Sequence, residues 1–157
     1  MITIRNAHEQ DAEQIIELLK QVLELHAEIR PDIFISGTTK YTKGEVTAII
    51  NDERRRTLVA EDNGVILGYA LCVIKEQPFS NNMIPFTTLY IDDLCVDNKS
   101  RGRNIGTLLF DYVKAEAKKT GCYEITLNVW EGNNAAKAFY DKMGMRPKET
   151  QMELILK

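Results

Sequence analysis

The segment between Leu89 and Thr107 constrains the fold of this chain more than any other. The apolar and β-branched run Leu89–Val96 is typical of a buried strand. Apolar residues at three- and four-residue intervals from Ile105 onward predict an amphipathic helix. The two are joined by a compact cationic turn with the sequence Arg101-Gly102-Arg103-Asn104-Ile105-Gly106-Thr107. The sequence therefore predicts a strand that passes through a tight turn into a helix.

This turn has the features of an anion-binding site. The first N–H groups of a helix lack intrahelical acceptors and carry partial positive charge, so phosphate oxygens bind there. Arg101 and Arg103 add full charges, while Gly102 and Gly106 let the backbone approach a ligand closely. An ordinary strand-to-helix loop with solvated arginines would use the same residues, so the turn alone leaves both interpretations open.

The overall composition narrows the classes of protein that the chain can belong to. Its 157 residues suffice for one domain with its own core, and we expect residues 1–157 to form that single domain. The net charge of −3 argues against nucleic-acid binding, which needs an excess of basic surface. No apolar run approaches the roughly 20 residues of a transmembrane helix, so we expect no membrane segment.

Cysteine and histidine usage predicts a reduced protein without a metal site. Cys72, Cys95 and Cys122 are odd in number and lack metal-ligand spacing, and the N-terminus has no signal-peptide pattern, so we expect a cytoplasmic location. His8 and His26 are too few and too scattered to build a metal centre.

Apolar periodicity predicts the element order β-α-α-β-β-β-α-β-α-β. The first helix is expected to open at a capping box of Asn6 and Glu9 and to end before Pro31. Strands are expected at 1–5, 57–61, 65–75, 86–96, 123–129 and 151–156, and further helices at 44–52, from 105 to about 120, and at 133–143. Early hairpins and a late strand–helix–strand unit indicate an α/β (α+β) fold with a mixed sheet covered by helices.

Three segments resemble the GNAT superfamily of acyl-CoA-dependent N-acyltransferases. The turn at 101–106 is similar to that family's pyrophosphate-binding signature, which is Arg or Gln, two residues, Gly, one residue, then Gly or Ala. The strand 91–96 lies at the family's spacing before it. The third segment is similar to the family's Asn-x-x-Ala-x-x-Leu-Tyr-x-x-x-Gly ending and consists of Asn133, Ala136, Phe139, Tyr140 and Gly144.

One position departs from the family signature. Asn104 stands where the signature has its first Gly. Asn is the residue besides Gly that best tolerates left-handed dihedral angles, and its side chain can cap a helix. We therefore expect the turn to keep its shape, with the affinity for coenzyme as the property that this residue affects.

The resemblance implies a GNAT fold with splayed central strands and a site for acetyl-CoA. The pantetheine arm would lie along the strand that ends at Val96, bonded by main-chain groups. The residues that the resemblance assigns to the cofactor are Leu94, Cys95, Val96, Arg101, Gly102, Arg103, Asn104, Ile105, Gly106, Thr107 and Asn133.

Acetyl transfer to an amine needs a base and an acid. A primary amine with a pKa near 10 is almost fully protonated at pH 7, so a carboxylate has to take its proton. Strand alternation places Asp92 and Asp93 on opposite faces, so only one can reach the cleft, and the resemblance favours Asp92. A carboxylate that only binds neighbouring groups is the alternative. The resemblance also makes Tyr140 the acid that protonates the departing thiolate; on its own, Tyr140 would be interpreted as a packed aromatic side chain.

The function that the resemblance implies is transfer of an acetyl group from acetyl-CoA to a primary amine of a small molecule, by direct attack in a ternary complex. The acceptor would enter between residues 24–43 and 77–86, and a homodimer is possible. The alternatives are a protein N-terminal or lysine acetyltransferase, and a non-catalytic acyl-CoA-binding module of the same fold. A nucleotide hydrolase is disfavoured because the turn lacks the Gly-Lys-Ser/Thr of a phosphate-binding loop.

Overall fold

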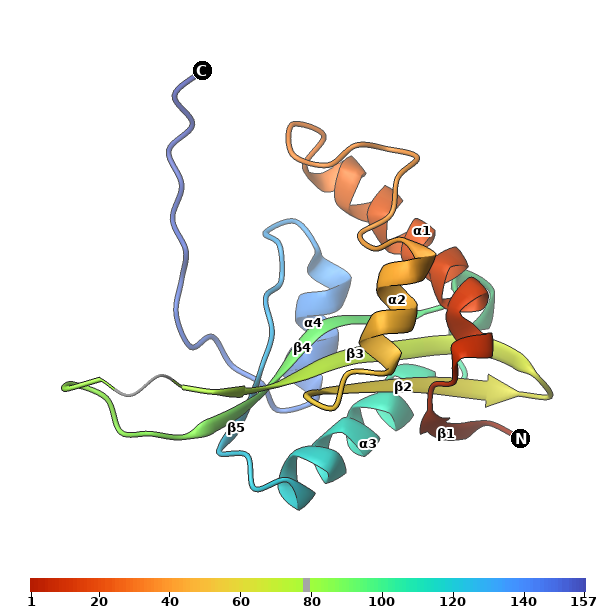
Figure 1. The fold of residues 1–157 in the computed structure, drawn as a ribbon. Coiled ribbons are helices and arrows are strands. Elements are labelled where there is room, and N and C mark those ends of the chain that lie inside the picture. Colours follow the sequence, from red (N-terminus) through yellow and green to blue (C-terminus); the bar gives the residue numbers. More distant parts are fainter. Residues whose placement is uncertain (78–79) are drawn as a thin grey trace.

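A five-stranded mixed sheet forms the centre of the computed structural model, which describes residues 1–77 and 80–157 (Figure 1). The strands lie in the sheet in their sequence order. They are β1 (Thr3–Asn6), β2 (Arg55–Asp62), β3 (Val65–Glu76), β4 (Thr87–Val96) and β5 (Glu124–Thr126). Neighbouring strands from β1 to β4 are antiparallel, and β4 and β5 are parallel. The predicted α/β class with a mixed sheet is confirmed.

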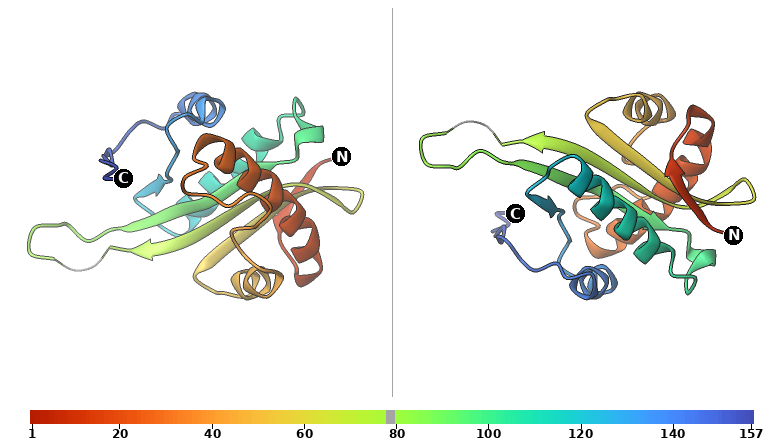
Figure 2. Two further views of the ribbon diagram at one scale, coloured as in Figure 1. Left: turned by 90° about the horizontal axis from the view of Figure 1, so that it is seen from above. Right: turned by 90° about the horizontal axis from the view of Figure 1, so that it is seen from below.

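Helices cover both faces of this sheet. The helices α1 (Ala12–Ile29) and α2 (Lys43–Ile50) lie on one face, and α3 (Ile105–Lys119) lies on the other, as the views from above and below show (Figure 2). The fourth helix, α4 (Asn134–Lys142), packs beside α3, because Phe139 and Tyr140 both contact Phe110 of α3. The sheet therefore separates two apolar clusters, one against each helical layer. In the part of the chain that the structure describes, every helix is too short or too polar to cross a bilayer.

The hairpin between β2 and β3 forms as predicted. Asn63 and Gly64 adopt positive φ angles of 50° and 81°, which are the dihedral angles that a tight two-residue hairpin turn requires. The loop predicted at 77–85 includes residues 78 and 79, which lie outside the described residues.

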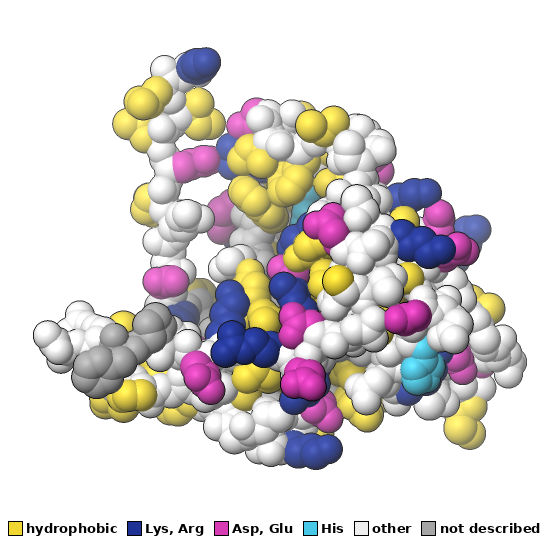
Figure 3. Space-filling view, in the orientation of Figure 1, with side chains coloured by type: hydrophobic (Ala, Val, Ile, Leu, Met, Phe, Trp, Pro, Cys, Tyr) yellow, Lys and Arg dark blue, Asp and Glu magenta, His cyan; other side chains and the backbone are white. Residues whose placement is uncertain are grey.

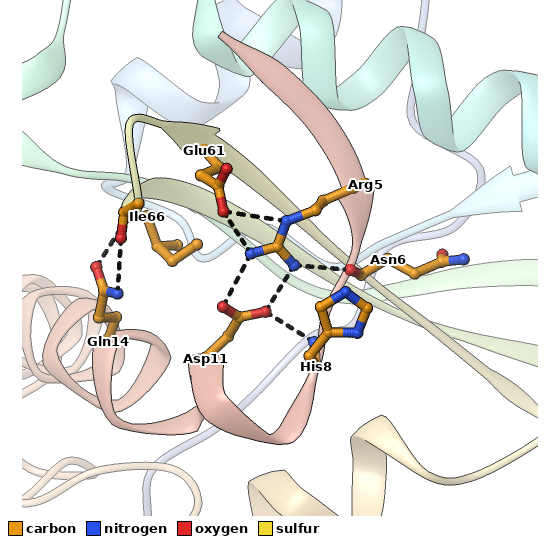
Figure 4. A network of polar contacts seen from close by, with 8 residues as sticks. Arg5, Asn6, His8, Asp11, Gln14, Glu61 and Ile66 are labelled. Atoms are coloured by element: carbon orange, nitrogen blue, oxygen red, sulfur yellow. Dashed lines mark hydrogen bonds and ion pairs between the residues drawn. The ribbon is translucent and has the colours of Figure 1, made fainter.

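The start of α1 differs from the prediction. The capping box of Asn6 and Glu9 is wrong, because Asn6 belongs to β1 and the short 3-10 turn Glu9–Asp11 precedes the helix. The Asp11 carboxylate instead accepts the His8 N–H at 2.7 Å and two hydrogen bonds from Arg5. Arg5 also pairs with Glu61 of β2 at 2.7 Å, so its guanidinium joins β1 to β2 and to the buried Asp11 carboxylate that precedes α1 (Figure 4).

The end of the chain also differs from the prediction. The strand expected at 123–129 shortens to Glu124–Thr126, and the strand expected at 151–156 does not form. Residues 147–157, here named the C-terminal segment, run extended and exposed away from the sheet (Figure 1, blue). A strand needs a neighbour for its backbone hydrogen bonds, and among the described residues none lies on the outer side of β5. The element order therefore ends with α4.

Candidate active site

The sheet opens at the end of β4. β4 and β5 pair only where Thr88–Tyr90 face Glu124–Thr126. Beyond this point residues 127–130 leave the sheet, and β3 is the only strand that pairs with residues 91–96 in the described part of the chain. The predicted splay of the central strands is confirmed, and the backbone near Leu94–Val96 is free to bond a ligand from one side.

The cationic turn lies directly beyond this open edge. The residues Arg101, Gly102, Arg103 and Asn104 are exposed, and Asn104 precedes α3 in the left-handed conformation with φ 64°. Its side chain makes no capping hydrogen bond. The backbone N–H groups of residues 102–107 donate to no acceptor within the described ranges 1–77 and 80–157. Because unpaired N–H groups at a helix start attract anions, the turn retains the geometry expected of a phosphate cradle.

The two arginines of the turn differ in their partners. Arg101 donates to the side-chain oxygen of Asn98 at 3.2 Å, whereas Arg103 forms an ion pair with Asp62 at 2.8 Å. Asp62 lies at the hairpin between β2 and β3, which the sequence did not place beside the turn. The Asp62 carboxylate therefore neutralises part of the positive charge that the sequence predicts for the cradle.

Ile105 and Gly106 of the turn face the interior of the protein, and Gly102 determines the backbone conformation of the turn. Ile105 is buried in the cluster under α3, so only its backbone can reach a ligand. A β-carbon on Gly106 would lie 3.2 Å from the Phe139 ring, so this glycine allows α4 to approach α3. A β-carbon on Gly102 would meet no atom within 4 Å, but the φ of this residue is 85°, so its role is conformational.

A β-bulge in β4 changes the predicted placement of the two aspartates. Asp93 pairs with Leu71 and Ile91 pairs with Cys72, which leaves Asp92 as an extra residue between them. Strand alternation is broken at this point. The prediction that Asp92 and Asp93 lie on opposite faces is wrong, since both carboxylates find partners on the side of α1 and α2.

The partners of the two carboxylates come from distant parts of the chain. Asp92 accepts hydrogen bonds from the Tyr41 hydroxyl at 2.6 Å and from the Lys40 ammonium at 2.9 Å. Asp93 accepts one from the Tyr69 hydroxyl at 2.9 Å. Burial raises the pKa of Asp93 to about 6, with the Tyr69 hydrogen bond and the charge of Lys40 opposing the rise. Asp93 therefore changes its charge much closer to neutral pH than an ordinary aspartate.

Tyr140 lies on α4 with its ring half-buried against Phe110 and Phe139. Its hydroxyl has no hydrogen-bond partner among the residues that the structure describes. Burial, followed by the negative charge of Asp93, raises the pKa of Tyr140 above its ordinary value. The Tyr140 hydroxyl is therefore protonated at neutral pH, and the Asp93 carboxylate is close enough to influence it by its charge.

Asn133 and Cys95 have structural partners. Asn133 caps α4, because its side-chain oxygen accepts the Ala136 N–H at 3.3 Å, and its amide NH₂ donates to no acceptor among the described residues. The Cys95 thiol is buried toward α1, and burial raises its pKa to about 12. A thiol held in this state is a poor nucleophile. Within the described residues, no group of three or more His, Cys, Asp or Glu side chains is placed to hold a metal ion.

Comparison with known proteins decides the family. The family model described as "Acetyltransferase (GNAT) family" matches residues 19–145. The chain belongs to the GNAT acetyltransferase family. This GNAT chain is 35% identical over 63 residues to glucosamine 6-phosphate N-acetyltransferase of Arabidopsis thaliana, which covers 40% of each chain. It is 26% identical over 144 residues to the 5-NmdU N-acetyltransferase of Pseudomonas phage PaMx11, covering 92% of this chain and 86% of the phage protein.

Solved structures share the GNAT fold of this chain from end to end. A crystal structure of a mutant of the BH1408 protein from Bacillus halodurans superposes with a TM-score of 0.94 at 36% identity, covering 98% of this chain and 99% of that one. The crystal structure of glucosamine-6-phosphate N-acetyltransferase from Arabidopsis thaliana gives a TM-score of 0.72 at 25% identity, covering 100% and 99%.

The GNAT fold brings the predicted site residues to one end of the sheet. The unpaired edge of β4 continues into the cationic turn. Tyr140 lies close enough to Asp93 of that strand for the charge of Asp93 to raise the pKa of the Tyr140 hydroxyl. Sequence reasoning missed Lys40 and Tyr69 as partners of the aspartates. They are 52 and 24 residues away from the carboxylates that they bind, so no local pattern could have revealed them.

Proposed function

We propose that this chain transfers an acetyl group from acetyl-CoA to a primary amine of a small molecule. The observation that carries this proposal is the open edge of β4 running into a turn whose N–H groups at 102–107 lack acceptors among the described residues. Such an edge can bond an extended chain of amides, and such a turn can bond a diphosphate. In coenzyme A, a pantetheine arm with two amides is joined directly to a diphosphate, so the two parts follow each other in this order.

Each part of the coenzyme has residues suited to hold it. The N–H groups of the turn and the Arg101 guanidinium would bind the diphosphate, with Arg103 contributing if it leaves Asp62. The main chain of Leu94, Cys95 and Val96 would bond the pantetheine amides, and the free amide NH₂ of Asn133 would reach the same arm. When bound, acetyl-CoA supplies the acetyl group as an activated thioester. A backbone N–H near Leu94 or Val96 would polarise the thioester carbonyl.

Asp92 is the proposed base, with Asp93 as the alternative. Asp92 is partly exposed and already binds the ammonium of Lys40, so its surroundings suit a cationic amine. Asp93 is less accessible, but its pKa of about 6 makes it the better proton acceptor near neutral pH, through a bridging water. The pH dependence of kcat/KM distinguishes the two candidates. If Asp93 is the base, the activity should fall below about pH 6 in the wild type and in Asp92→Asn, and this acidic limb should disappear in Asp93→Asn.

Tyr140 is the proposed acid that gives its proton to the departing sulfur. We expect Tyr140→Phe to lower kcat by about a hundredfold, because proton transfer by a positioned group contributes that order of acceleration. The affinity for acetyl-CoA, measured by calorimetry, should stay almost unchanged. Tyr112→Phe on the exposed side of α3 is the matched control and should retain full activity. Unchanged turnover in Tyr140→Phe would remove Tyr140 from the mechanism.

The acceptor amine is defined by fewer residues than the coenzyme. The stretch matched to the plant relative covers only 40% of that enzyme, so its substrate does not transfer directly. The names of two relatives, a glucosamine 6-phosphate and a 5-NmdU N-acetyltransferase, support a small molecule that carries an amine. Lys40, Tyr41 and Asp92 would line the entrance beside α1.

A panel of acceptors tests the reaction. Glucosamine 6-phosphate, polyamines, amino acids and peptides are each incubated with acetyl-CoA, and thiol release is followed together with the product mass. Acetylation of a small amine supports the proposal, while acetylation of peptides alone would favour a protein acetyltransferase. Binding of acetyl-CoA without transfer to any amine would favour a non-catalytic acyl-CoA module.

A further inference from the structure

The side chain of Lys40 holds a primary amine against the proposed base. Its ammonium donates to the Asp92 carboxylate at 2.9 Å. The Lys40 side chain is 45% exposed, whereas that of Asp92 is 14% exposed. An acceptor amine that gives its proton to Asp92 has to occupy the position where the Lys40 ammonium lies. The chain therefore carries, at the proposed acceptor site, a group of the chemical kind that the reaction consumes.

The loop between α1 and α2 is fixed close to β4 around Lys40. The Tyr41 hydroxyl donates to the second carboxylate oxygen of Asp92 at 2.6 Å, and the Thr39 hydroxyl donates to the main-chain oxygen of Tyr41 at 2.8 Å. Basic and acidic side chains mix on the face of the sheet beside α2 (Figure 3). The backbone at Lys40 is thus held in place, and the side chain is the part that can move.

The other lysines that form ion pairs are placed differently. In the part of the chain that the structure describes, they are Lys20, Lys43, Lys137 and Lys148, and their carboxylate partners lie outside β4. Lys40 is the lysine that an ion pair holds on β4, the strand along which the pantetheine arm would lie. Its position therefore sets it apart from an ordinary surface lysine.

Lys40 lies close to the place expected for the thioester. The thioester carbonyl would be held near Leu94 or Val96, and two residues along a strand span about 7 Å. The Lys40 ammonium already lies 3.4 Å from the main-chain oxygen of Asp92 on this strand. Lysine carries its amine on a flexible four-carbon stem. A change of rotamer, without movement of the loop, can therefore bring the nitrogen to the thioester.

We propose that Lys40 is an internal acceptor, so that the chain transfers the acetyl group of acetyl-CoA to its own Lys40 when no external amine is present. This inference rests on the proposed function, because it uses the same coenzyme site and the same base. It assigns to Lys40 a modification that occupies the acceptor site from within.

The resting form of Lys40 is the ammonium. Burial lowers its pKa, but the hydrogen bond and the charge of Asp92 raise it, and the net shift is upward. An ammonium has no lone pair with which to attack, so one proton first passes to the Asp92 carboxylate. Internal transfer is therefore limited by the same deprotonation as transfer to an external amine.

The transfer then balances as for any other amine. The Lys40 nitrogen attacks the acetyl carbonyl carbon, so that a C–N bond forms and the C–S bond breaks. The nitrogen loses a second proton, and the departing thiolate gains one from Tyr140. The products are acetyl-lysine, the thiol of coenzyme A and one proton released to solvent. Acetylation also removes the positive charge that pairs with Asp92.

Mass spectrometry of the full chain tests the internal transfer. The wild type is incubated with ¹³C-labelled acetyl-CoA and no added amine, and the label is located by peptide mapping. We expect Lys40 to be acetylated about a hundredfold faster than Lys43, the order of acceleration that a positioned base contributes. Lys43 is the matched control, because it is exposed and ion-paired but its partner is Glu13 of α1. Equal rates at Lys40 and Lys43 would indicate unassisted chemical acetylation and overturn the proposal.

Two further measurements test the geometry of the transfer. At saturating acetyl-CoA the rate at Lys40 should not depend on protein concentration, whereas a rate that rises with it would place the reaction between two chains and overturn the proposal. Asp92→Asn should reduce the rate at Lys40 to that at Lys43, because it removes the ion pair that positions the amine. An unchanged preference for Lys40 in this variant would also overturn the proposal.

The outcomes separate the internal acceptor from the proposed function. Transfer to a small amine while Lys40 stays unmodified, in the presence or absence of that amine, would overturn the internal acceptor and leave the proposed function in place. Acetylated Lys40 without transfer to any external amine would support the internal acceptor and contradict the small-molecule reaction. Failure of both transfers would contradict both.

Discussion

At the scale of single residues, Asn104 shows how a departure from a family signature is accommodated. The residue adopts φ 64°, and its side chain makes no capping bond, so the amide has no structural role in the described chain. Left-handed dihedral angles cost most L-residues about 1–2 kcal/mol, and Asn less. The turn therefore keeps the shape that a glycine would give it.

We expect Asn104→Gly to retain or improve the affinity for acetyl-CoA, measured by calorimetry, because no contact of the amide is lost. Its free energy of unfolding should stay within about 1 kcal/mol of the wild type. Asn104→Ala is the contrasting variant and should lose about 1 kcal/mol, since alanine tolerates this φ less well. A large loss of affinity in Asn104→Gly would show that the amide itself binds the coenzyme.

The buried carboxyl of Asp93 makes stability depend on pH. Its pKa rises from an ordinary value of 3.8 to about 6 in the folded protein, so the folded state holds this proton more tightly than the unfolded state. The stabilising contribution is complete below about pH 4 and is lost as the pH rises through about 6.

Asp93→Asn has no carboxyl group to ionise. We therefore expect its free energy of unfolding, relative to that of the wild type, to be about 2 kcal/mol higher at pH 8 than at pH 4. Urea denaturation at a series of pH values measures this difference. Asp111→Asn on the exposed face of α3 is the control and should follow the wild type. A constant difference between Asp93→Asn and the wild type would contradict the raised pKa.

At the scale of elements, the junction of β3, β4 and α3 depends on Gly68. A β-carbon at this position would lie 2.7 Å from the Cys95 carbonyl oxygen and 3.2 Å from Leu109 of α3. A backbone oxygen cannot move aside cheaply, so the absence of a side chain at Gly68 lets β3 pack against both β4 and α3.

We expect Gly68→Ala to lower the free energy of unfolding by about 2 kcal/mol, because overpacking of a tight contact costs this amount. Gly44→Ala in α2 is the matched control. Its β-carbon meets nothing closer than 3.9 Å, so the variant should be as stable as the wild type within about 1 kcal/mol. Urea denaturation compares the two, and equal stability of both variants would contradict the argument.

The elements also show which predictions the sequence could support. Apolar periodicity located α1, α2 and α3, because burial on one face leaves a regular pattern in the sequence. It could not reveal the bulge at Asp92, since a bulge depends on how β3 pairs with β4. It predicted a strand at 151–156 from alternation alone, and alternation does not say which neighbour the strand will have. The site residues on β4, the turn and α4 came from family motifs, whereas their partners Lys40 and Tyr69 required the fold.

At the scale of the whole molecule, the proposed coenzyme site links stability to ligand concentration. A ligand that binds only the folded state stabilises it, by about 2.7 kcal/mol at a hundred times its Kd. Acetyl-CoA at that excess should raise the Tm of this 157-residue chain by about 5–10 °C. Differential scanning calorimetry measures the shift, and a Tm that does not change with acetyl-CoA would contradict the site.

The close approach of Gly106 to Phe139 has a consequence for how this molecule would respond to its coenzyme. The contact joins the first turn of α3, where a diphosphate would be gripped, to the residue next to Tyr140. A displacement at one end of this contact is transmitted to the other, because packed rings and backbone do not compress. Occupancy of the phosphate cradle would thus set the position of the phenol some distance away, and a variant in the turn would alter the rate of the chemical step as well as the strength of binding.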